Sequence, residues 1–130
     1  ATWFHVSREK GNSGRPWQGI NIIEPLGYID FLGLLTNSKL VLTDSGGIQE
    51  ESTCLNVPCI TLRENTERPV TITKGTNVLA GTTKRGILNA FEYQRKKVYK
   101  KRRPPYWDGK AANRIIHILL KSARTNVGWP

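Results

Sequence analysis

Short apolar runs alternate with amphipathic stretches along most of the chain, from residue 21 onward. We expect strands at 21–26, 39–43, 58–62 and 77–80, and helices at 28–38, 48–55, 82–101 and 110–122. Residues 40–42 are contiguously apolar, which is typical of a strand covered on both faces. Alternation at this spacing favours parallel strands joined by right-handed crossover helices.

The expected fold is therefore α/β, with a parallel sheet of about four strands in a partial Rossmann-like, three-layer α/β/α domain. This incomplete domain is expected at 21–122, and a tail follows at 123–130. Residues 1–20 form a lead-in whose pattern predicts no clear helix or strand, and we take it as the remnant of an upstream strand. The length of 130 residues suits one hydrophobic core. The chain starts at Ala1 and contains no methionine, so we expect a trimmed or fragmentary chain.

The first twenty residues contain no apolar run of signal-peptide length, and no stretch of the sequence reaches transmembrane length. Arg8, Lys10 and Arg15 interrupt the first twenty residues, and no later run is long enough to span a bilayer. Cys54 and Cys59 are the only cysteines, and we expect them to be reduced, buried thiols rather than a disulfide or metal site. The expectation is a cytoplasmic protein with no membrane partner, no metal and no cofactor.

The net charge of +10 comes from the last part of the chain. Residues 1–94 carry nine basic and nine acidic side chains, whereas residues 95–130 carry eleven basic and one acidic. Seven of the nine residues at 95–103 are basic, a cluster that could attract nucleic acid or another polyanion. The alternative, which we favour, is a solvated helix end whose cations complement the helix dipole.

The stretch 42–51, with the sequence LTDSGGIQEE, is the most informative part of the chain. It places Ser45, Gly46 and Gly47 between a predicted strand and a predicted helix, where open parallel sheets bind their ligands. Glycines allow close approach of the backbone, and the first helical amides favour an anion such as phosphate. Glu51 follows about one turn later, and its carboxylate can only accept, which suits the hydroxyls of a ribose.

A plainer interpretation of this stretch stays open on local chemistry alone. Asp44 or Ser45 could be a simple N-cap, with the glycine pair forming a tight turn. Glu50 and Glu51 would then serve only to complement the helix dipole.

Several segments resemble the UDP-N-acetylglucosamine 2-epimerase family in order and spacing. They are EPLGYIDF at 24–31, LTDSGGIQEE at 42–51, TERP at 66–69, GTN at 75–77 and PYWDGKAA at 105–112. The resemblance covers about residues 21–120. It implies the carboxy-terminal, UDP-binding domain of a GT-B-type enzyme.

The resemblance also implies roles for individual residues around UDP. The backbone near Leu26 and the ring of Phe31 would hold uracil, and Ser45–Gly47 would bind the diphosphate through a hydroxyl and amides. Glu51 would accept hydrogen bonds from the ribose. Arg68 would be the cationic partner of the nucleotide or sugar, since its donors form a rigid fork that matches diphosphate oxygens. The residues so implied are Leu26, Phe31, Ser45, Gly46, Gly47, Glu51 and Arg68.

Some of these residues have a purely structural alternative. Phe31 could be a core residue of an amphipathic helix, and Arg68 could be a surface residue paired with Glu64 or Glu67. The stretch beginning at His5 looks like a degraded version of a His-Pro-Arg strand end of the family, and we expect His5 to be structural.

The reaction that the resemblance implies inverts carbon 2 of the sugar by eliminating UDP and adding it back. The family's acid and base carboxylates belong to an amino-terminal domain that this chain does not contain, so we expect no catalytic residue here and no activity of the chain alone. The implied partners are UDP or UDP-N-acetylglucosamine, the amino-terminal domain, and further copies in a homo-oligomeric parent enzyme. A stand-alone nucleotide-sugar-binding module and a basic nucleic-acid-binding domain are the alternatives, although nucleic acid is not the expected partner.

Overall fold

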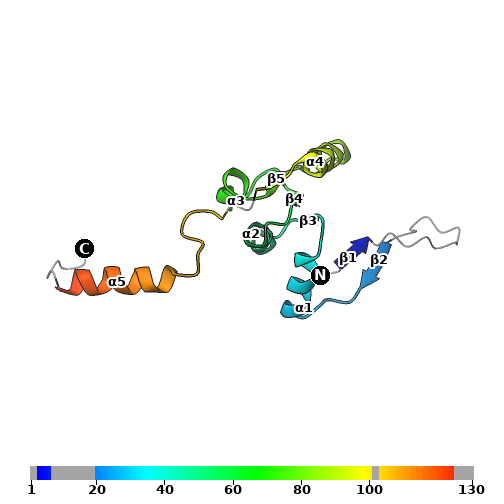
Figure 1. Ribbon diagram of the computed structural model, residues 1–130. Helices are drawn as coiled ribbons and strands as arrows, with labels where there is room; N and C mark the ends of the chain where they lie inside the picture. The colour runs from blue at the N-terminus through cyan, green and yellow to red at the C-terminus, as the bar shows by residue number, and fades with distance from the viewer. Residues whose placement is uncertain (1–2, 7–19, 101–102, 125–130) are drawn as a thin grey trace, which may run out of the picture. The chain divides into compact units, whose positions relative to one another are not determined.

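The computed structural model describes residues 3–6, 20–100 and 103–124. The chain forms two units, residues 1–37 and residues 38–130 (Figure 1). The remaining residues, which include most of the expected lead-in and of the tail, lie outside the described part.

The described residues of the first unit form an antiparallel strand pair followed by a helix. Strand β1 (Trp3–Val6) pairs with β2 (Ile20–Ile23), with Trp3 opposite Ile23. The strand expected at 21–26 therefore exists, but its partner is antiparallel, and it does not belong to the parallel sheet. Helix α1 (Tyr28–Thr36) follows, and the amide of Phe31 donates to the Gly27 carbonyl over 2.9 Å in its first turn.

The second unit is built on a three-stranded parallel sheet. Its strands are β3 (Val41–Thr43), β4 (Cys59–Thr61) and β5 (Asn77–Leu79), in the order β3-β4-β5. Val41 is in register with Cys59, which in turn is in register with Asn77. The predicted α/β class and parallel pairing are confirmed, with three parallel strands in the described residues where about four were expected.

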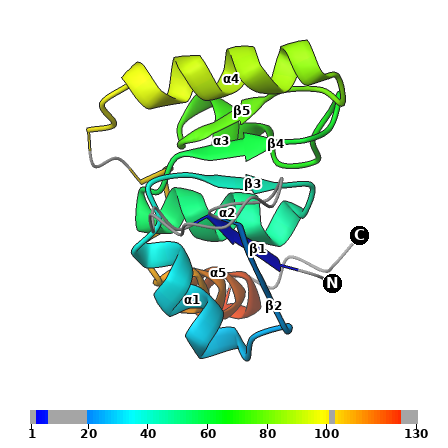
Figure 2. The same cartoon turned by 90° about the vertical axis from the view of Figure 1, so that its right-hand side faces the viewer.

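Crossover helices connect these strands. Helix α2 (Gly46–Leu55) joins β3 to β4, and the short α3 (Pro69–Thr73) joins β4 to β5. Because both crossovers advance in the same direction along the sheet, α2 and α3 lie on one face, where they contact each other. Helix α4 (Lys84–Lys96) packs on β4 and β5 from the other face (Figures 1 and 2). Sequence analysis missed α3, because a five-residue helix shows no periodicity.

The core of the second unit is small and unusually polar. Its buried apolar residues are Ile48, Val57, Cys59, Ile60 and Ala90. The buried polar residues are Thr43, Gln49, Ser52, Thr53, Thr61, Thr71, Thr76, Asn77 and Gln94. Because burying an unpaired polar group costs free energy, these side chains must largely satisfy one another.

Helix α4 packs on the sheet through one small apolar residue and one polar residue. Ala90 and Gln94 are buried, whereas Leu88 and Phe91 stay exposed. Gln94 Nε2 donates to the backbone carbonyls of Cys59 and Thr76, over 2.7 and 2.8 Å, and so ties α4 to the sheet. Gln94 lies four residues after Ala90 and therefore shares its face of the helix.

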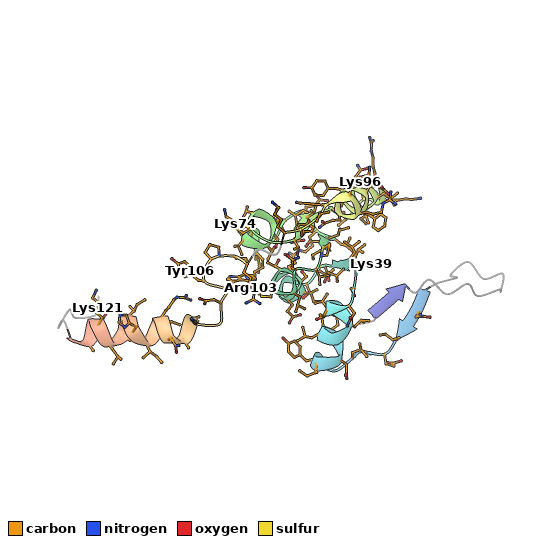
Figure 3. The ribbon with its side chains drawn as sticks, viewed as in Figure 1. Lys39, Lys74, Lys96, Arg103, Tyr106 and Lys121 are labelled. Carbon is orange, nitrogen blue, oxygen red and sulfur yellow. The ribbon has the colours of Figure 1, made fainter. Side chains whose placement is uncertain are left out.

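Helix α5 (Ala111–Arg124) carries a broad apolar stripe that is exposed to solvent. The exposed residues are Ile115, Ile116, Ile118, Leu119 and Leu120. Side chains project from α5 all along its length (Figure 3). In the described part of the chain every helix is too short or too polar to cross a membrane.

The two cysteines lie in contrasting environments, although both were expected to be buried. Cys54 on α2 is exposed and Cys59 on β4 is fully buried, and both are free thiols. Burial raises the pKa of the Cys59 thiol to about 11, so the fold favours its protonated form. The stability that this preference contributes is present below the pKa of the unfolded thiol, about 8.5, and is lost as the pH rises through the folded value.

We expect one thiol per chain to react with an aromatic disulfide reagent at pH 8 under native conditions. Cys54 should be that thiol, and Cys59 should react only when urea unfolds the second unit. Comparison of the Cys54→Ser and Cys59→Ala variants assigns the two reactions. Rapid native labelling of the Cys54→Ser variant would contradict the burial of β4.

Candidate functional site

The junction between β3 and α2 contains backbone amides that have no acceptor within the helix. Ser45 is the N-cap of α2, in extended backbone conformation, and its hydroxyl caps none of the helix amides. Its own amide donates to Thr43 Oγ1 over 3.1 Å. The first intrahelical bond runs from the Gln49 amide to the Ser45 carbonyl over 3.2 Å, so the helix offers no acceptor to the three preceding amides. The helix begins at Gly46, two residues earlier than expected, which makes both glycines part of its first turn.

Exposure along this turn permits a ligand to approach. Ser45 and Gly47 are exposed, and Gly46 is half-buried. Glu51 is also half-buried, about one turn further along the same helix. These positions leave the predicted anion site open to solvent, and the helix dipole favours negative charge there.

The side chain of Arg68 lies over this first turn. A Cβ atom placed on Gly46 would be 3.8 Å from Arg68 Cγ and 3.9 Å from Arg68 Nε. The structure therefore brings Arg68 and Gly46 together, although Gly46 begins α2 and Arg68 lies between β4 and α3. Glycine at this position lets the guanidinium stem lie close to the helix backbone.

Arg68 is paired with an acid that sequence analysis did not select. Its Nε lies 3.1 Å from Glu50 Oε1, with both side chains about two-fifths exposed. This is a charge contact, because Nε is buried without a directed hydrogen bond. The partners considered from sequence, Glu64 and Glu67, do not take this role. Glu64 accepts instead from the Thr82 amide over 3.3 Å, and Glu67 contacts Arg68 only through its backbone carbonyl, 3.5 Å from Nη1.

Buried polar residues behind Arg68 were also missed by sequence analysis. They are Gln49, Thr61, Thr71 and Asn77, with the half-buried Thr66 beside them. Their burial had one signal in the sequence: threonine, asparagine and glutamine occupy positions of the predicted strands and helices where apolar residues are expected to face the core.

Leu26 and Phe31 belong to the first unit. Leu26 is exposed in the loop before α1, and Phe31 is half-buried on that helix. Phe31 thus has an accessible part of its ring, and its role in holding a base stays a prediction. His5 lies on β1, opposite Asn21.

The basic cluster at 95–103 begins in the last turn of α4, where Arg95 and Lys96 complement the helix dipole (Figure 3). Arg95 pairs with Glu92 over 2.9 Å, and Lys97 Nζ lies 4.9 and 4.7 Å from the ring centres of Tyr93 and Tyr99. The hydrogen bond from Lys97 to the Tyr93 hydroxyl raises the pKa of Lys97. These contacts agree with the helix-end interpretation; residues 101 and 102 of the cluster lie outside the described part.

A surface cavity of about 370 Å³ lies elsewhere, beside β5. It is lined by Ile72, Asn77, Val78, Leu79, Tyr93 and Lys97. None of the predicted site residues borders it. Among the described residues, no three His, Cys, Asp or Glu side chains gather closely enough to hold a metal ion.

Comparison with known proteins places the chain in a family. The model of the family described as UDP-N-acetylglucosamine 2-epimerase matches residues 6–120. The UDP-N-acetylglucosamine 2-epimerase of Methanococcus maripaludis is 50% identical over 104 residues, and that of Methanocaldococcus jannaschii 51% identical over 102 residues. These matches cover 78% and 77% of this chain, respectively, and 27% of each relative, so the chain spans about a quarter of their length.

Solved structures agree with this assignment. The structure of the Methanocaldococcus jannaschii epimerase in complex with UDP-GlcNAc and UDP is 48% identical and has a TM-score of 0.67 over 76% of this chain and 27% of that one. A co-structure of S. aureus MnaA with UDP is 34% identical, with a TM-score of 0.70 over 88% of this chain and 32% of that one. With its parallel sheet, its SGG helix start and a family match across most of its length, the chain belongs to the UDP-N-acetylglucosamine 2-epimerase family.

Proposed function

We propose that the chain binds the UDP moiety of UDP-N-acetylglucosamine at the β3–α2 junction. The observation that carries this proposal is the position of Arg68 over Gly46, which sets a guanidinium beside the first amides of a helix. The guanidinium and the positive end of the helix dipole both create positive potential at this edge of the sheet. The relatives solved with UDP support the same ligand class.

The proposed roles follow the chemistry of each group. The amides of Gly46 and Gly47 and the hydroxyl of Ser45 bind the diphosphate, and Arg68 exchanges Glu50 for a phosphate oxygen. Glu51 accepts from the ribose hydroxyls, since an ionised carboxylate has no donor of its own. We propose that Leu26 and Phe31 hold the uracil.

We further propose that the parent protein inverts carbon 2 of the sugar by eliminating UDP and adding it back. This chain would stabilise the departing UDP, because preorganised donors act on charge that develops on the leaving group. Proton removal and return need an acid and a base, which we assign to a domain outside this chain. The chain alone is then a binding unit without turnover, and a homo-oligomeric parent is part of the same proposal.

Calorimetric titration of UDP into the chain tests the proposal. We expect saturable binding that weakens by about tenfold or more in Glu51→Ala, since hydrogen bonds to a charged acceptor are worth about 1.5–3 kcal/mol. Glu92→Ala is the matched control, because it removes an exposed acid from α4. Its affinity should equal that of the wild type.

Three outcomes would count against parts of the proposal. Equal affinities in Glu51→Ala and Glu92→Ala would remove Glu51 from the site. Epimerisation of UDP-N-acetylglucosamine by the chain alone would contradict the assignment of acid and base to another domain. Binding of single-stranded RNA with a steep salt dependence, and no response to UDP, would favour the nucleic-acid-binding alternative.

A further inference from the structure

A polar network connects α2 to the loop that carries Arg68. Thr66 Oγ1 donates to Gln49 Oε1 over 2.6 Å, and Asn77 Nδ2 donates to the same oxygen over 3.2 Å. Asn77 Nδ2 also donates to Thr71 Oγ1 over 3.0 Å, and Thr61 Oγ1 donates to Asn77 Oδ1 over 2.7 Å. The network thus joins α2, β4 and β5 to Thr66 in the loop before α3 and to Thr71 within α3.

The network ends on the two backbone polar groups of Arg68. The Arg68 amide donates to Thr66 Oγ1 over 3.0 Å, and the Arg68 carbonyl accepts from Thr71 Oγ1 over 2.7 Å. Thr66 is fixed by Gln49, and Thr71 is fixed by Asn77. The amide and the carbonyl of Arg68 therefore each bind a side chain of the network that does not touch the predicted anion site, and the carbonyl also accepts from the Thr71 amide over 3.0 Å.

Burial makes this arrangement rigid. Gln49, Thr61, Thr71 and Asn77 are all at most 3% exposed, so breaking their hydrogen bonds would leave polar groups without water. Arg68 itself is the residue before α3, with irregular backbone angles (φ −119°, ψ 58°) that no regular element imposes. Its conformation depends on the hydrogen bonds on either side.

A fixed backbone matters for a residue with a long side chain. Ordering a loop and its long side chain on a ligand costs free energy, and a backbone that is already fixed removes the loop's part of that cost before binding. The Arg68 stem already lies over Gly46, and its Nε is held 3.1 Å from Glu50. The guanidinium is thus directed to the start of α2 in the absence of a phosphate.

We propose that Gln49 and Asn77 are positioning residues for Arg68: acting through Thr66 and Thr71, they hold its backbone so that the guanidinium meets the diphosphate of the ligand at the start of α2. This inference rests on the proposed function, because it assigns the network a task only if Arg68 binds phosphate oxygens. Neither residue touches the ligand in this scheme.

Isosteric variants test the proposal with UDP and uridine as probes. Thr66→Val removes the hydroxyl between Gln49 and the Arg68 amide, and Gln49→Met removes the shared acceptor at nearly constant volume. Each should weaken UDP binding by about threefold to tenfold and leave the affinity for uridine unchanged. Thr76→Val is the matched control, since its buried hydroxyl donates to the Val57 carbonyl over 2.6 Å, outside the network. It should preserve both affinities.

A double-mutant cycle separates positioning from general support of the fold. In an Arg68→Ala background, Thr66→Val should cause no further loss of UDP affinity, because the group it positions is gone. Equal losses for UDP and uridine, or a loss of UDP affinity that persists without Arg68, would overturn the proposal. If Gln49→Met fails to fold, the half-buried Thr66 still provides the decisive variant.

Amide hydrogen exchange of Arg68 gives a readout that does not depend on UDP. The Arg68 amide should exchange faster in Thr66→Val and in Gln49→Met, and at the wild-type rate in Thr76→Val. Unchanged exchange in both network variants would contradict the positioning claim even if UDP binds. Absence of UDP binding by the wild-type chain would instead reject the proposed function, while the exchange rates still decide whether the network holds Arg68.

Discussion

Replacing Gly75 by alanine is expected to lower the free energy of unfolding by about 2–3 kcal/mol, because no space exists for a methyl group. A Cβ atom there would lie 2.5 Å from Thr53 Oγ1, 2.6 Å from Thr53 Cγ2 and 2.5 Å from the Thr71 carbonyl oxygen. The Thr71 carbonyl is backbone, so relief requires α3 to move away from α2. Urea titration, with exposure of the Cys59 thiol as the reporter, measures the change.

Gly33→Ala is the matched control for this substitution. A Cβ atom on Gly33 would have nothing within 4 Å, and the residue lies inside α1. Alanine there should leave stability unchanged or raise it by up to about 1 kcal/mol. A Gly75→Ala variant that unfolds at the wild-type urea concentration would show that α2, α3 and β5 do not meet as described.

Replacing Arg68 by alanine is expected to weaken UDP binding by about tenfold to a hundredfold, since charge-assisted hydrogen bonds are worth about 1.5–3 kcal/mol. Arg68→Lys should fall between alanine and the wild type, because an ammonium keeps the charge but lacks the planar fork. Uridine affinity should not change. Isothermal titration calorimetry with both ligands separates these effects.

Arg95→Ala provides the charge-matched control. Arg95 lies in the last turn of α4, and Glu92 is its partner, so its removal lowers the net charge equally without touching the β3–α2 junction. If Arg95→Ala and Arg68→Ala weaken UDP binding by the same factor, overall charge would explain the effect and Arg68 would have no specific role.

The sequence predicted those features that depend on local pattern. The parallel arrangement followed from the spacing of apolar runs, and the strand-turn-helix at SGG followed from glycines after an apolar run; the anion site there stays a prediction. The ion pair between Arg68 and Glu50 shows what local pattern does not predict. Glu64 and Glu67 are nearer to Arg68 in sequence, but the crossover connection brings the preceding helix and its Glu50 into contact.

The network behind Arg68 could not be predicted for the same reason. Gln49 meets Thr66 and Asn77 across 17 and 28 residues of sequence. A single glutamine on a helix that carries both polar and apolar residues does not alter the hydrophobic periodicity, so the sequence does not predict that it is buried. Its burial is favourable only when these partners are in place. The antiparallel pairing of β2 is also non-local, since its partner comes from the lead-in that appeared unreadable.

The partial exposure of the Arg68–Glu50 pair bears on the speed of ligand exchange. Both side chains are about two-fifths exposed, so separating them forfeits at most about 1 kcal/mol. Transfer of the guanidinium from carboxylate to an incoming anion then needs only rotation of side-chain bonds, a motion of picoseconds to nanoseconds. We therefore expect the association rate of the diphosphate with Arg68 to be limited by diffusional encounter and to decrease with added salt.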